Sequence, residues 1–319
     1  MILVTGATGF VGNAVVHNLL GKAKQESVAV AVRTKGKNWP QNVKENIVGG
    51  LDASTEWSDA LNGITSIVHC AARVHVMHDS SSDPLAEFRR VNVEGTMKLA
   101  RQAAAAGVGR FVFLSSIKVN GENTSLNQPY TSEDKPAPVD PYGVSKQETE
   151  EGLNLLAAET GMEMVIIRPP LVYGPGVKAN FYNMMSWLYK GIPLPFGSIH
   201  NQRSFVALDN LVDLIVTCIL HPAAANQTFL VSDGEDLSTT ELLRRTAAAL
   251  GKEPRLLHVP QSLLDLAFRL LGKEDLARRL CGSLQVDINK TRKVLGWSPP
   301  LHVDEGLRVT AEAFLRAIK

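Results

Sequence analysis

Residues 140–146, with the sequence DPYGVSK, place a phenol and an ammonium group four positions apart. In the first turn of a helix, residues i and i+4 share one face, so Tyr142 and Lys146 reach the same point in space. A phenol has an unperturbed pKa of about 10, and a neighbouring cation favours its ionised form. The spacing predicts an acid–base pair in which Tyr142 exchanges a proton near neutral pH. The pair alone also fits a solvated helix terminus.

A glycine-rich turn follows the first apolar segment, residues 1–5, and leads into a helical pattern. Its sequence is Gly6-Ala7-Thr8-Gly9-Phe10-Val11-Gly12. Glycines let the backbone approach phosphates, and a helix N-terminus offers free amides and a partial positive charge. The order strand, turn and helix predicts a dinucleotide site, whose contacts we expect to be Gly6, Thr8, Gly9, Phe10 and Val11. The alternative is a glycine turn without a ligand.

The second predicted strand, Val28–Val32, ends in a base rather than an acid. In NAD-binding units an acidic residue near this point holds the ribose 2′-hydroxyl. Val32 stands where that acid is expected, and Arg33, Lys35 and Lys37 add positive charge that suits a 2′-phosphate. The segment therefore favours NADP over NAD. A surface arginine at a strand end is the alternative.

Small or polar residues follow the other predicted strands. They are expected to lie at the edge of the sheet where ligands bind. Asp52, after a strand at 46–48, is placed to reach an adenine amino group. The remaining cofactor contacts that we predict are Ala71 and Ala72 after strand 66–70, Ser115, which with Ser116 ends a strand at 110–116, and Pro169 after strand 164–168.

Two polar features have competing interpretations. Asn92 interrupts the apolar face of a long helix predicted over 83–106, which indicates either a specific hydrogen bond near the cofactor or an exposed asparagine. His75 and His78 lie close together, but no further ligand has helpful spacing. We therefore expect a substrate-side loop there and no metal site.

The alternation of strands and helices predicts an α/β fold, a Rossmann-type doubly wound parallel sheet over 1–168. Parts of about 203–232 are expected to rejoin it. The remainder, 169–319, is predicted to be a smaller α+β substrate-binding region. Its helical patterns fit 179–190, 208–221, 238–250, 261–272, 289–295 and 303–317, and its strand-like pieces are 204–207, 228–231 and 256–259.

Composition excludes some classes of function. The formal net charge of +1 among 319 residues indicates no nucleic-acid surface. Cys70, Cys218 and Cys281 are widely spaced and sit in apolar runs, as expected of reduced thiols in a cytoplasmic protein. There is no signal-peptide pattern, and no apolar run reaches membrane-spanning length. The apolar segment Ser262–Leu271 is predicted to be a core-facing helix rather than a membrane anchor.

Several motifs in a fixed order give the chain a family resemblance. It resembles the extended short-chain dehydrogenase/reductase family, in its nucleotide-sugar epimerase/dehydratase (UDP-glucose 4-epimerase-like) branch, from Met1 to about Phe314. The motifs are TGATGFVG at 5–12, HCAA at 69–72, NVEGT at 92–96, LSS at 114–116, YGVSK at 142–146, RPPLVYG at 168–174 and LGW at 295–297.

The resemblance implies a role for each catalytic residue. Tyr142 is similar to the family's proton donor or acceptor. Lys146 is similar to the lysine that lowers the tyrosine pKa and binds the nicotinamide ribose, and Ser116 to the hydroxyl that orients the substrate's carbonyl or alcohol. In this arrangement hydride moves between the nicotinamide and a sugar carbon, while the tyrosine handles the proton on oxygen.

Three activities compete within the branch. The 4,6-dehydratases that the chain resembles carry an Asp-Glu pair after the serine position, where this chain has Ile117 and Lys118. Epimerases re-reduce the same carbon with retained NAD held by the strand-two acid, which is missing here. The resemblance therefore favours an NADP-dependent 4-ketoreductase. The alternatives are a 4-epimerase with bound NAD and a non-catalytic NADP-binding sensor.

The resemblance also suggests the substrate and the assembly. Arg203 is similar to the family's diphosphate-binding arginine, Asn180 to its substrate-loop asparagine, and Arg279 (or Arg278) to a second phosphate contact. Leu171 replaces an asparagine common in the family. Similarity to bacterial enzymes of surface-polysaccharide and O-antigen sugar supply suggests a UDP-linked 4-keto-6-deoxyhexosamine. Related proteins pair through helices equivalent to 83–106 and 141–160, which suggests a homodimer.

Overall fold

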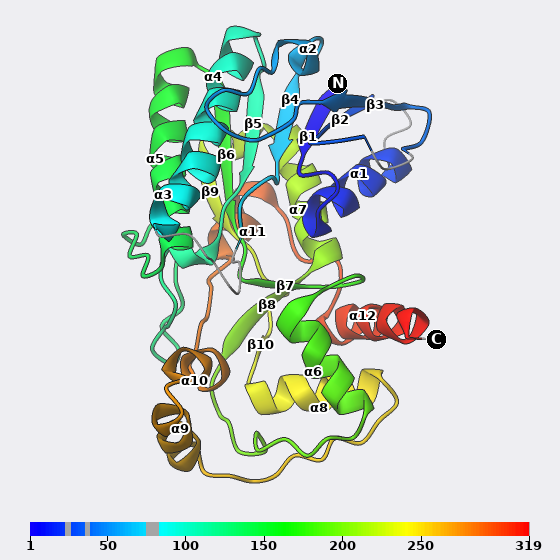
Figure 1. Ribbon diagram of the computed structural model, residues 1–319, viewed down its shortest axis with the longest axis vertical. Helices are drawn as coiled ribbons and strands as arrows, with labels where there is room; N and C mark the ends of the chain where they lie inside the picture. The colour runs from blue at the N-terminus through cyan, green and yellow to red at the C-terminus, as the bar shows by residue number, and fades with distance from the viewer. Residues whose placement is uncertain (23–26, 36–38, 75–82, 319) are drawn as a thin grey trace.

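The computed structural model describes residues 1–22, 27–35, 39–74 and 83–318. Figure 1 shows an upper body built on a twisted sheet and a lower body of helices around a small sheet. The seven strands of the upper sheet are all parallel, in the order β3-β2-β1-β4-β5-β6-β9. Their bounds are β1 Ile2–Thr5, β2 Val28–Val32, β3 Val43–Ile47, β4 Ser66–His69, β5 Arg110–Leu114, β6 Glu163–Arg168 and β9 Gln227–Leu230. The predicted doubly wound Rossmann-type sheet is therefore confirmed.

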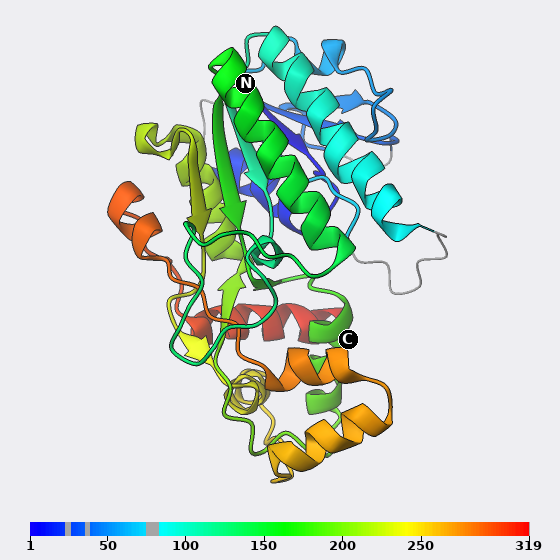
Figure 2. The same cartoon turned by 90° about the vertical axis from the view of Figure 1, so that its left-hand side faces the viewer.

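Residues along each strand alternate between two apolar layers, as the period of a β-strand requires. In β1, Ile2 and Val4 pack with α1 (Phe10–Lys22) and α7 (Leu208–Leu220). Leu3 between them points to the opposite face, which α4 (Thr96–Ala105) and α5 (Pro141–Thr160) cover. Figure 2 shows α4 and α5 side by side across that face. Both faces are thus buried, which explains the continuous apolar runs in the strands.

The helix predicted over 83–106 is divided into three parts. The segment α3 (Pro84–Phe88) leads into a π-helix, η1 (Arg89–Gly95), and then into α4. A π-turn is a local widening that often marks a functional site. Here it lies where Gly95 approaches the backbone of Leu51, at a point where a Cβ atom would be 2.8 Å from the Leu51 carbonyl carbon.

The lower body has its own apolar core, with Tyr173, Phe181 and Phe314 among its members. Its sheet has the order β10-β8-β7, formed by β7 Leu171–Tyr173, β8 Arg203–Ala207 and β10 Asp236–Leu237. Its helices are α6 Ala179–Tyr189, α8 Thr239–Ala249, α9 Gln261–Leu270, α10 Glu274–Cys281 and α12 Val303–Ala317. The remaining short elements of the chain are α2 Ser58–Leu61, η2 Ile117–Val119, η3 Pro222–Ala224 and α11 Asn289–Leu295.

Two expectations for this region are wrong. The predicted strand 256–259 is reduced to an isolated bridge between Leu194 and Leu256, because the segment pairs with a loop rather than with a strand. The segment Ser262–Leu271 forms helix α9, but only Leu264 is buried within that helix and most of its other leucines face solvent. Within the described residues, no helix is long and apolar enough to cross a membrane.

Helix α5 carries the predicted acid–base pair, and both of its ends are fixed locally. The Asp140 carboxylate accepts a hydrogen bond from the Gly143 amide at 2.7 Å, which caps the N-terminus. Pro141 occupies the first helical position, where a missing N–H costs nothing. Gly161, with φ of 74°, ends the helix in the left-handed conformation. These signals place Tyr142 and Lys146 in the first turns of the helix.

A buried ion pair ties the middle of α5 to β6. Glu150 and Arg168 approach to 2.5 Å, with side chains only 5% and 6% exposed. The Ser115 hydroxyl donates to Glu150, and Arg168 donates to the Asn120 amide oxygen at 2.9 Å. Each charge therefore has hydrogen-bond partners, a condition for tolerating buried ions.

Replacing one member of this pair tests how much the network stabilises the fold. We expect Glu150→Gln to lower the free energy of unfolding by about 3 kcal/mol, because Arg168 becomes an uncompensated buried charge. The matched control is Glu148→Gln on the same helix, since Glu148 pairs with Arg89 at the surface, where about 0.5 kcal/mol is expected. Urea denaturation measures both variants, and equal losses would contradict the assignment.

Candidate active site

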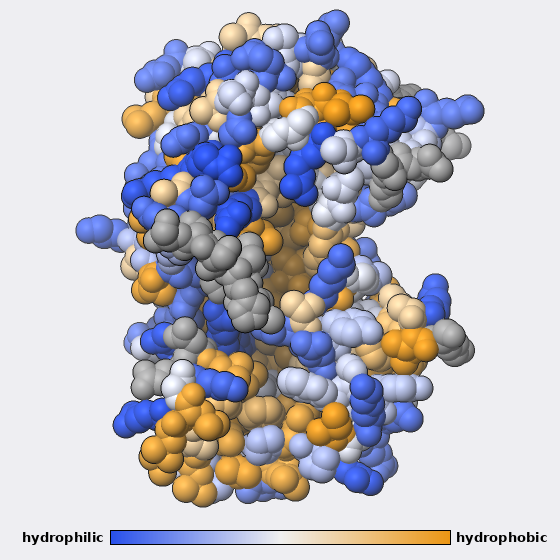
Figure 3. All heavy atoms as spheres, in the orientation of Figure 1, coloured by the Kyte–Doolittle hydropathy of each residue, from blue (hydrophilic) through white to orange (hydrophobic). Residues whose placement is uncertain are grey.

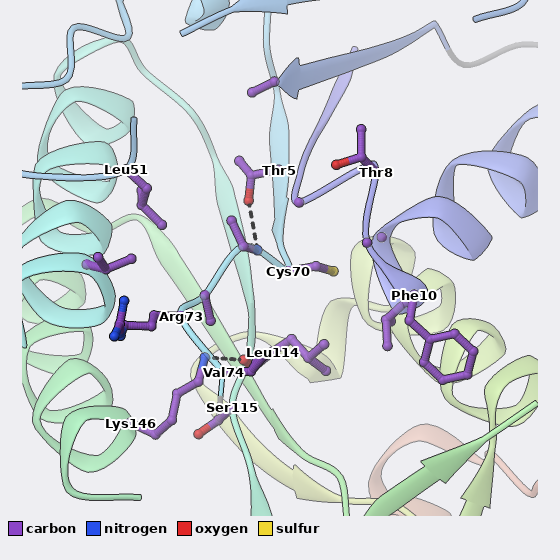
Figure 4. Close-up of a pocket in the computed structure, with 18 of the residues that line it drawn as sticks. Thr5, Thr8, Phe10, Leu51, Cys70, Arg73, Val74, Leu114, Ser115 and Lys146 are labelled. Carbon is purple, nitrogen blue, oxygen red and sulfur yellow. Dashed lines mark hydrogen bonds between the residues drawn. The ribbon is translucent and has the colours of Figure 1, made fainter. Parts of the chain in front are cut away.

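A cavity of about 770 Å³ opens at the carboxyl ends of the upper strands. It lies at the point where the strand order reverses between β1 and β4, which is where ligands bind in doubly wound sheets. Of the predicted cofactor residues, it is lined by Gly6, Thr8, Gly9, Phe10, Val11, Arg33, Asp52, Ala71, Ala72, Ser115, Tyr142, Lys146 and Pro169, together with Ser116. Figure 4 shows part of this wall, with Lys146 reaching from α5 toward Leu114.

The turn after β1 fits a dinucleotide diphosphate. Gly6 has φ of +65°, and a Cβ atom there would lie 2.7 Å from the Ala71 backbone nitrogen. A Cβ atom at Gly12 would lie 2.3 Å from the Gly6 carbonyl oxygen. Only glycine is tolerated in such contacts. The resulting turn leads directly into the N-terminus of α1, which favours anions.

The end of β2 contributes a cation to the cavity wall. Val32 is buried and lines the cavity, and the exposed Arg33 lines it directly after Val32. Lys35 is also exposed, whereas Lys37 lies outside the described residues. The cavity wall next to Val32 therefore carries the positive charge of Arg33, at the place where a NAD-binding unit would carry an acidic side chain.

Asp52 lines the same cavity after β3 and is held in place by its neighbours. Its carboxylate accepts hydrogen bonds from the Ser54 amide at 2.9 Å and the Ser54 hydroxyl at 2.6 Å. These hydrogen bonds lower the Asp52 pKa, so the group stays ionised and can accept a further hydrogen bond.

Asn92 does not line the cavity but connects two of its walls. Its side-chain oxygen accepts from the Arg73 amide at 2.8 Å, and its amide donates to the Arg73 carbonyl at 3.1 Å and the Ser145 hydroxyl at 3.0 Å. The loop after β4 is thus bonded through the π-helix to α5. This gives Asn92 a specific hydrogen-bond role, which positions other residues rather than contacting a ligand directly.

A buried histidine, which the sequence did not single out, links strands β1 and β4. His69 Nδ1 lies 2.8 Å from the Thr5 hydroxyl, and Nε2 lies 2.9 Å from the Thr96 hydroxyl. Burial, and secondarily the Lys146 charge, lowers the His69 pKa to about 3. The ring is therefore neutral at physiological pH and serves as a fixed bridge. Its place at the end of a buried strand was the available signal.

Tyr142 and Lys146 lie on one wall of the cavity, as their spacing predicted. The Lys146 ammonium donates to the Leu114 carbonyl at 2.9 Å and lies 4.4 Å above the Phe113 ring and 5.9 Å from the Tyr142 ring centroid. Ser116 ends the same strand region and accepts a hydrogen bond from the Lys118 amide at 3.3 Å. The three predicted catalytic side chains therefore belong to one site.

The electrostatics differ from the expectation for Tyr142. Burial, followed by the nearby Asp140 carboxylate, raises the Tyr142 pKa above its ordinary value. The predicted lowering by Lys146 is wrong for this structure, because burial of the phenol and the Asp140 charge both favour its protonated form. Burial lowers the Lys146 pKa to about 8. Tyr142 therefore holds its proton at neutral pH, as a proton donor must.

The residues after Ser116 present no carboxyl group at the positions of a dehydratase pair. Ile117 is buried, and Lys118 forms ion pairs with Glu122 at 2.8 Å and with Asp140. Because Asp140 also caps α5, Lys118 helps to hold the helix that carries Tyr142.

A second cavity of about 510 Å³ lies on the lower side and contains part of the predicted substrate site. It is lined by residues of the loop before α5, including Glu122 and Tyr130, and by Arg278 and Arg279 of α10. Arg203 on β8 is mostly buried and donates to the Gly282 carbonyl at 2.9 Å. Burial, followed by the Arg279 charge, lowers the Arg203 pKa, and Arg203 lines neither cavity.

The remaining predicted residues lie away from both cavities or are not among the residues that the structure describes. Asn180 is exposed at the start of α6 and lines neither cavity. His75 and His78 lie outside the described residues. Within the described part of the chain there is no cluster of three or more residues suited to a metal ion.

Comparison with known proteins defines the family. The model of the NAD dependent epimerase/dehydratase family matches residues 2–232. A Vibrio cholerae protein named UDP-glucose 4-epimerase is 53% identical over 317 residues, which cover 99% of this chain and 96% of that protein. A Mycolicibacterium smegmatis protein of the same name is 32% identical over 98% of this chain and 97% of its own length. The chain belongs to the NAD dependent epimerase/dehydratase family, as the resemblance predicted.

Solved structures agree on the fold. UDP-glucuronic acid 4-epimerase from Bacillus cereus, in complex with NAD, has a TM-score of 0.80 at 20% identity. The alignment covers 100% of this chain and 99% of that one. The likeness at this identity concerns the fold, and it extends over both bodies of the molecule.

The lowered pKa of Lys146 gives a testable pH dependence. Between pH 8 and about 10.4, the ordinary lysine value, the unfolded chain binds the proton more tightly, so this lysine's contribution to stability rises with pH. We expect the unfolding free energy of the wild type, relative to that of Lys146→Met, to increase by on the order of 2 kcal/mol when the pH rises from about 7 to about 10. Urea denaturation measures it, and a constant difference would contradict the burial of a titrating ammonium.

Proposed function

We propose that the chain reduces a nucleotide-linked, UDP-type 4-keto-6-deoxyhexosamine to the 4-hydroxy sugar with NADP as cofactor. Tyr142 donates the proton to the ketone oxygen, and Ser116 holds that oxygen by a hydrogen bond. Lys146 positions the nicotinamide ribose. The cofactor, when bound, supplies the hydride. This assignment specifies the reaction within a family that is already defined by the comparisons.

The observation that carries the proposal is the wall formed by Val32 and Arg33. Both residues line the cavity, and no acid stands at the end of β2 to receive a 2′-hydroxyl. A guanidinium fits a phosphate by paired, charge-assisted hydrogen bonds. NADP is kept largely reduced in cells, so net reduction is the natural use of an NADP site.

The protonated phenol of Tyr142 fits the donor role that a ketone reduction requires. Its raised pKa keeps the phenol protonated at neutral pH. A ketone reduction needs a proton donor, whereas oxidation of an alcohol needs a base. The charge and position of Lys118 argue against a dehydratase, since a paired ammonium cannot replace the carboxyl pair.

The second cavity supports a diphosphate-linked substrate. Arg278 and Arg279 of α10 line it. Guanidinium groups suit the geometry of phosphate oxygens by paired, charge-assisted hydrogen bonds. The substrate diphosphate would bind there, while Asn180 would approach it only from the exposed start of α6.

A 4-epimerase is the second candidate. It is favoured by the name UDP-glucose 4-epimerase that two relatives carry, the Vibrio cholerae protein with 53% identity and the Mycolicibacterium smegmatis protein with 32% identity. Epimerisation would use the same Tyr142, Lys146 and Ser116, but with a retained NAD that returns to its starting state.

A direct assay separates the two activities. Purified protein is incubated with NADPH and a UDP-4-keto-6-deoxy-N-acetylhexosamine, and the loss of NADPH absorbance is followed. We expect oxidation of NADPH matched by formation of the 4-hydroxy sugar. Tyr142→Phe should lower kcat by about 10²- to 10⁴-fold, whereas Tyr189→Phe, an exposed tyrosine of α6, should leave it unchanged. Protein-bound NAD after purification, with 4-epimerisation of a UDP-hexose and no use of NADPH, would reverse the ranking.

The role of Arg33 is tested by cofactor preference. We expect Arg33→Ser to weaken NADPH binding by about 10- to 100-fold, because a charge-assisted hydrogen bond to the 2′-phosphate is lost. Binding of NADH, which lacks that phosphate, serves as the internal control and should change little. Titration of both cofactors by fluorescence measures the effect, and equal losses for the two would argue against a 2′-phosphate contact.

A further inference from the structure

A buried tryptophan in the wall of the first cavity has a hydrogen-bond donor without a partner. Trp57 is 2% exposed and lines the same cavity as Asp52. Its backbone amide donates to the Gln102 side-chain oxygen at 2.8 Å, whereas its indole Nε1 has no hydrogen-bond partner among the residues that the structure describes. A buried donor that has lost its hydrogen bonds to water without replacing them costs free energy. An acceptor supplied by a ligand of the cavity would remove that cost.

A second buried tryptophan finds its acceptor within the protein. Trp297 is 5% exposed, and its Nε1 donates to the Asp213 carboxylate at 3.0 Å. It lines neither of the two cavities. The fold therefore supplies an acceptor to the buried indole that lies away from the cavities, and supplies none to the indole in the cavity wall.

The order of the strands places Trp57 at the adenine end of a bound dinucleotide. β3 is the edge strand, and Gly50, Leu51 and Asp52 follow it and line the cavity. Tyr142 lines the cavity from α5, near the end of β5, and the turn that fits the diphosphate follows β1 between them. Figure 3 shows the surface hollowed below the upper sheet, on the side where the strands drawn in Figure 1 end. A dinucleotide with its nicotinamide beside Tyr142 therefore has its adenine near the end of β3.

The polar groups at this end match two neighbouring groups of adenine. The adenine amino group donates hydrogen bonds, and the ring nitrogen N1 beside it accepts one. The Asp52 carboxylate, which Ser54 holds in place, is an acceptor, and the indole N–H is a donor only. We propose that Trp57 donates its indole N–H to adenine N1 of the bound cofactor, beside the contact of Asp52 with the amino group. Trp57 is then a residue that selects the adenine base.

Arg90 of the π-helix is the competing donor in this part of the wall. It lines the cavity, but its guanidinium already donates to Glu87 at 3.0 Å and lies 4.0 Å from the Asp52 carboxylate. Its side chain is also 49% exposed, so water can satisfy its remaining N–H groups. The indole of Trp57 has neither a protein acceptor nor access to bulk water, and a ligand acceptor therefore benefits it more.

The proposal rests on a nicotinamide dinucleotide in this cavity and not on the sugar that is converted. NAD and NADP carry the same adenine, so the contact serves a reductase and an epimerase alike. The two cofactor assignments fail separately. The role of Arg33 fails if NADPH and NADH respond equally to its replacement, whereas the role of Trp57 fails on a comparison of adenine with hypoxanthine.

Cofactors with hypoxanthine in place of adenine test the contact. Hypoxanthine has an oxygen in place of the amino group and a hydrogen on N1, so it presents an acceptor to Asp52 and a donor to the indole. The Kd values of NADPH and deamino-NADPH for the full chain are measured by nicotinamide fluorescence. We expect the wild type to bind deamino-NADPH about 10- to 100-fold more weakly, because polar groups of the site are left unpaired. Trp57→Phe should weaken NADPH binding by about 5- to 10-fold and leave deamino-NADPH nearly unchanged.

The ratio of the two Kd values separates the contact from a general loss of packing. Trp297→Phe also removes a buried indole and its hydrogen bond, and should keep the wild-type ratio. An unchanged ratio in Trp57→Phe would overturn the proposal, because N1 would then have another donor. A ratio that falls in Arg90→Met and not in Trp57→Phe would overturn it as well, and would assign N1 to Arg90.

A measurement on the wild-type chain does not depend on the folding of Trp57→Phe. The chain has four tryptophans, and each gives one indole N–H signal in a ¹⁵N–¹H spectrum. Replacing Trp39, Trp187 and Trp297 singly by Phe identifies three signals and leaves that of Trp57. We expect NADPH to move the Trp57 proton downfield, as a new hydrogen bond does, and deamino-NADPH not to do so. The absence of a downfield shift with saturating NADPH would contradict the proposal.

Discussion

The active site depends on a close approach of two backbone segments that leaves no room for a side chain between them. The turn after β1 lies against the loop after β4 at Gly6, and the start of α1 folds back on that turn at Gly12. His69 bridges the same two strands and reaches α4 through Thr96. Because the turn after β1 and the loop after β4 meet through backbone alone, the space above the carboxyl ends of the strands stays open as the cavity. A Cβ atom at Gly6 would collide with the backbone of the loop after β4. The cofactor site therefore depends on this backbone contact at Gly6.

The catalytic side chains are positioned from the other side of the crevice by α5. Asp140 caps the helix, Lys118 pairs with Asp140, and Glu150 ties the helix to β6 through Arg168. Asn92 adds a bond from the π-helix to Ser145, between Tyr142 and Lys146 in the sequence. The helix is thus fixed at its start, in its first turns and in its middle. Such support fixes Tyr142 in the wall of the cavity, as proton transfer requires.

Much of this was accessible from the sequence because its signals are local. Apolar runs between turns predicted the strands, and the spacing of Tyr142 and Lys146 predicted that they share one face of a helix, now seen as α5. The fold and the family were confirmed. The π-helix, the role of His69 and the raised pKa of Tyr142 depend on contacts between distant segments, so periodicity could not reveal them. The outward stripe of α9 was missed for another reason: its leucines have a helical period, and the pattern does not say which stripe faces the core.

We propose that Tyr142 and Lys146 serve a net reduction at C4 of a nucleotide-linked sugar. The most direct measurement follows an isotope. NADPH with deuterium at nicotinamide C4, on the transferable face, is incubated with the UDP-4-keto sugar, and the product is analysed by NMR. We expect one deuterium at C4 of the 4-hydroxy sugar. Product that carries hydrogen at C4, or a UDP-hexose epimerised without any label from the added cofactor, would contradict it.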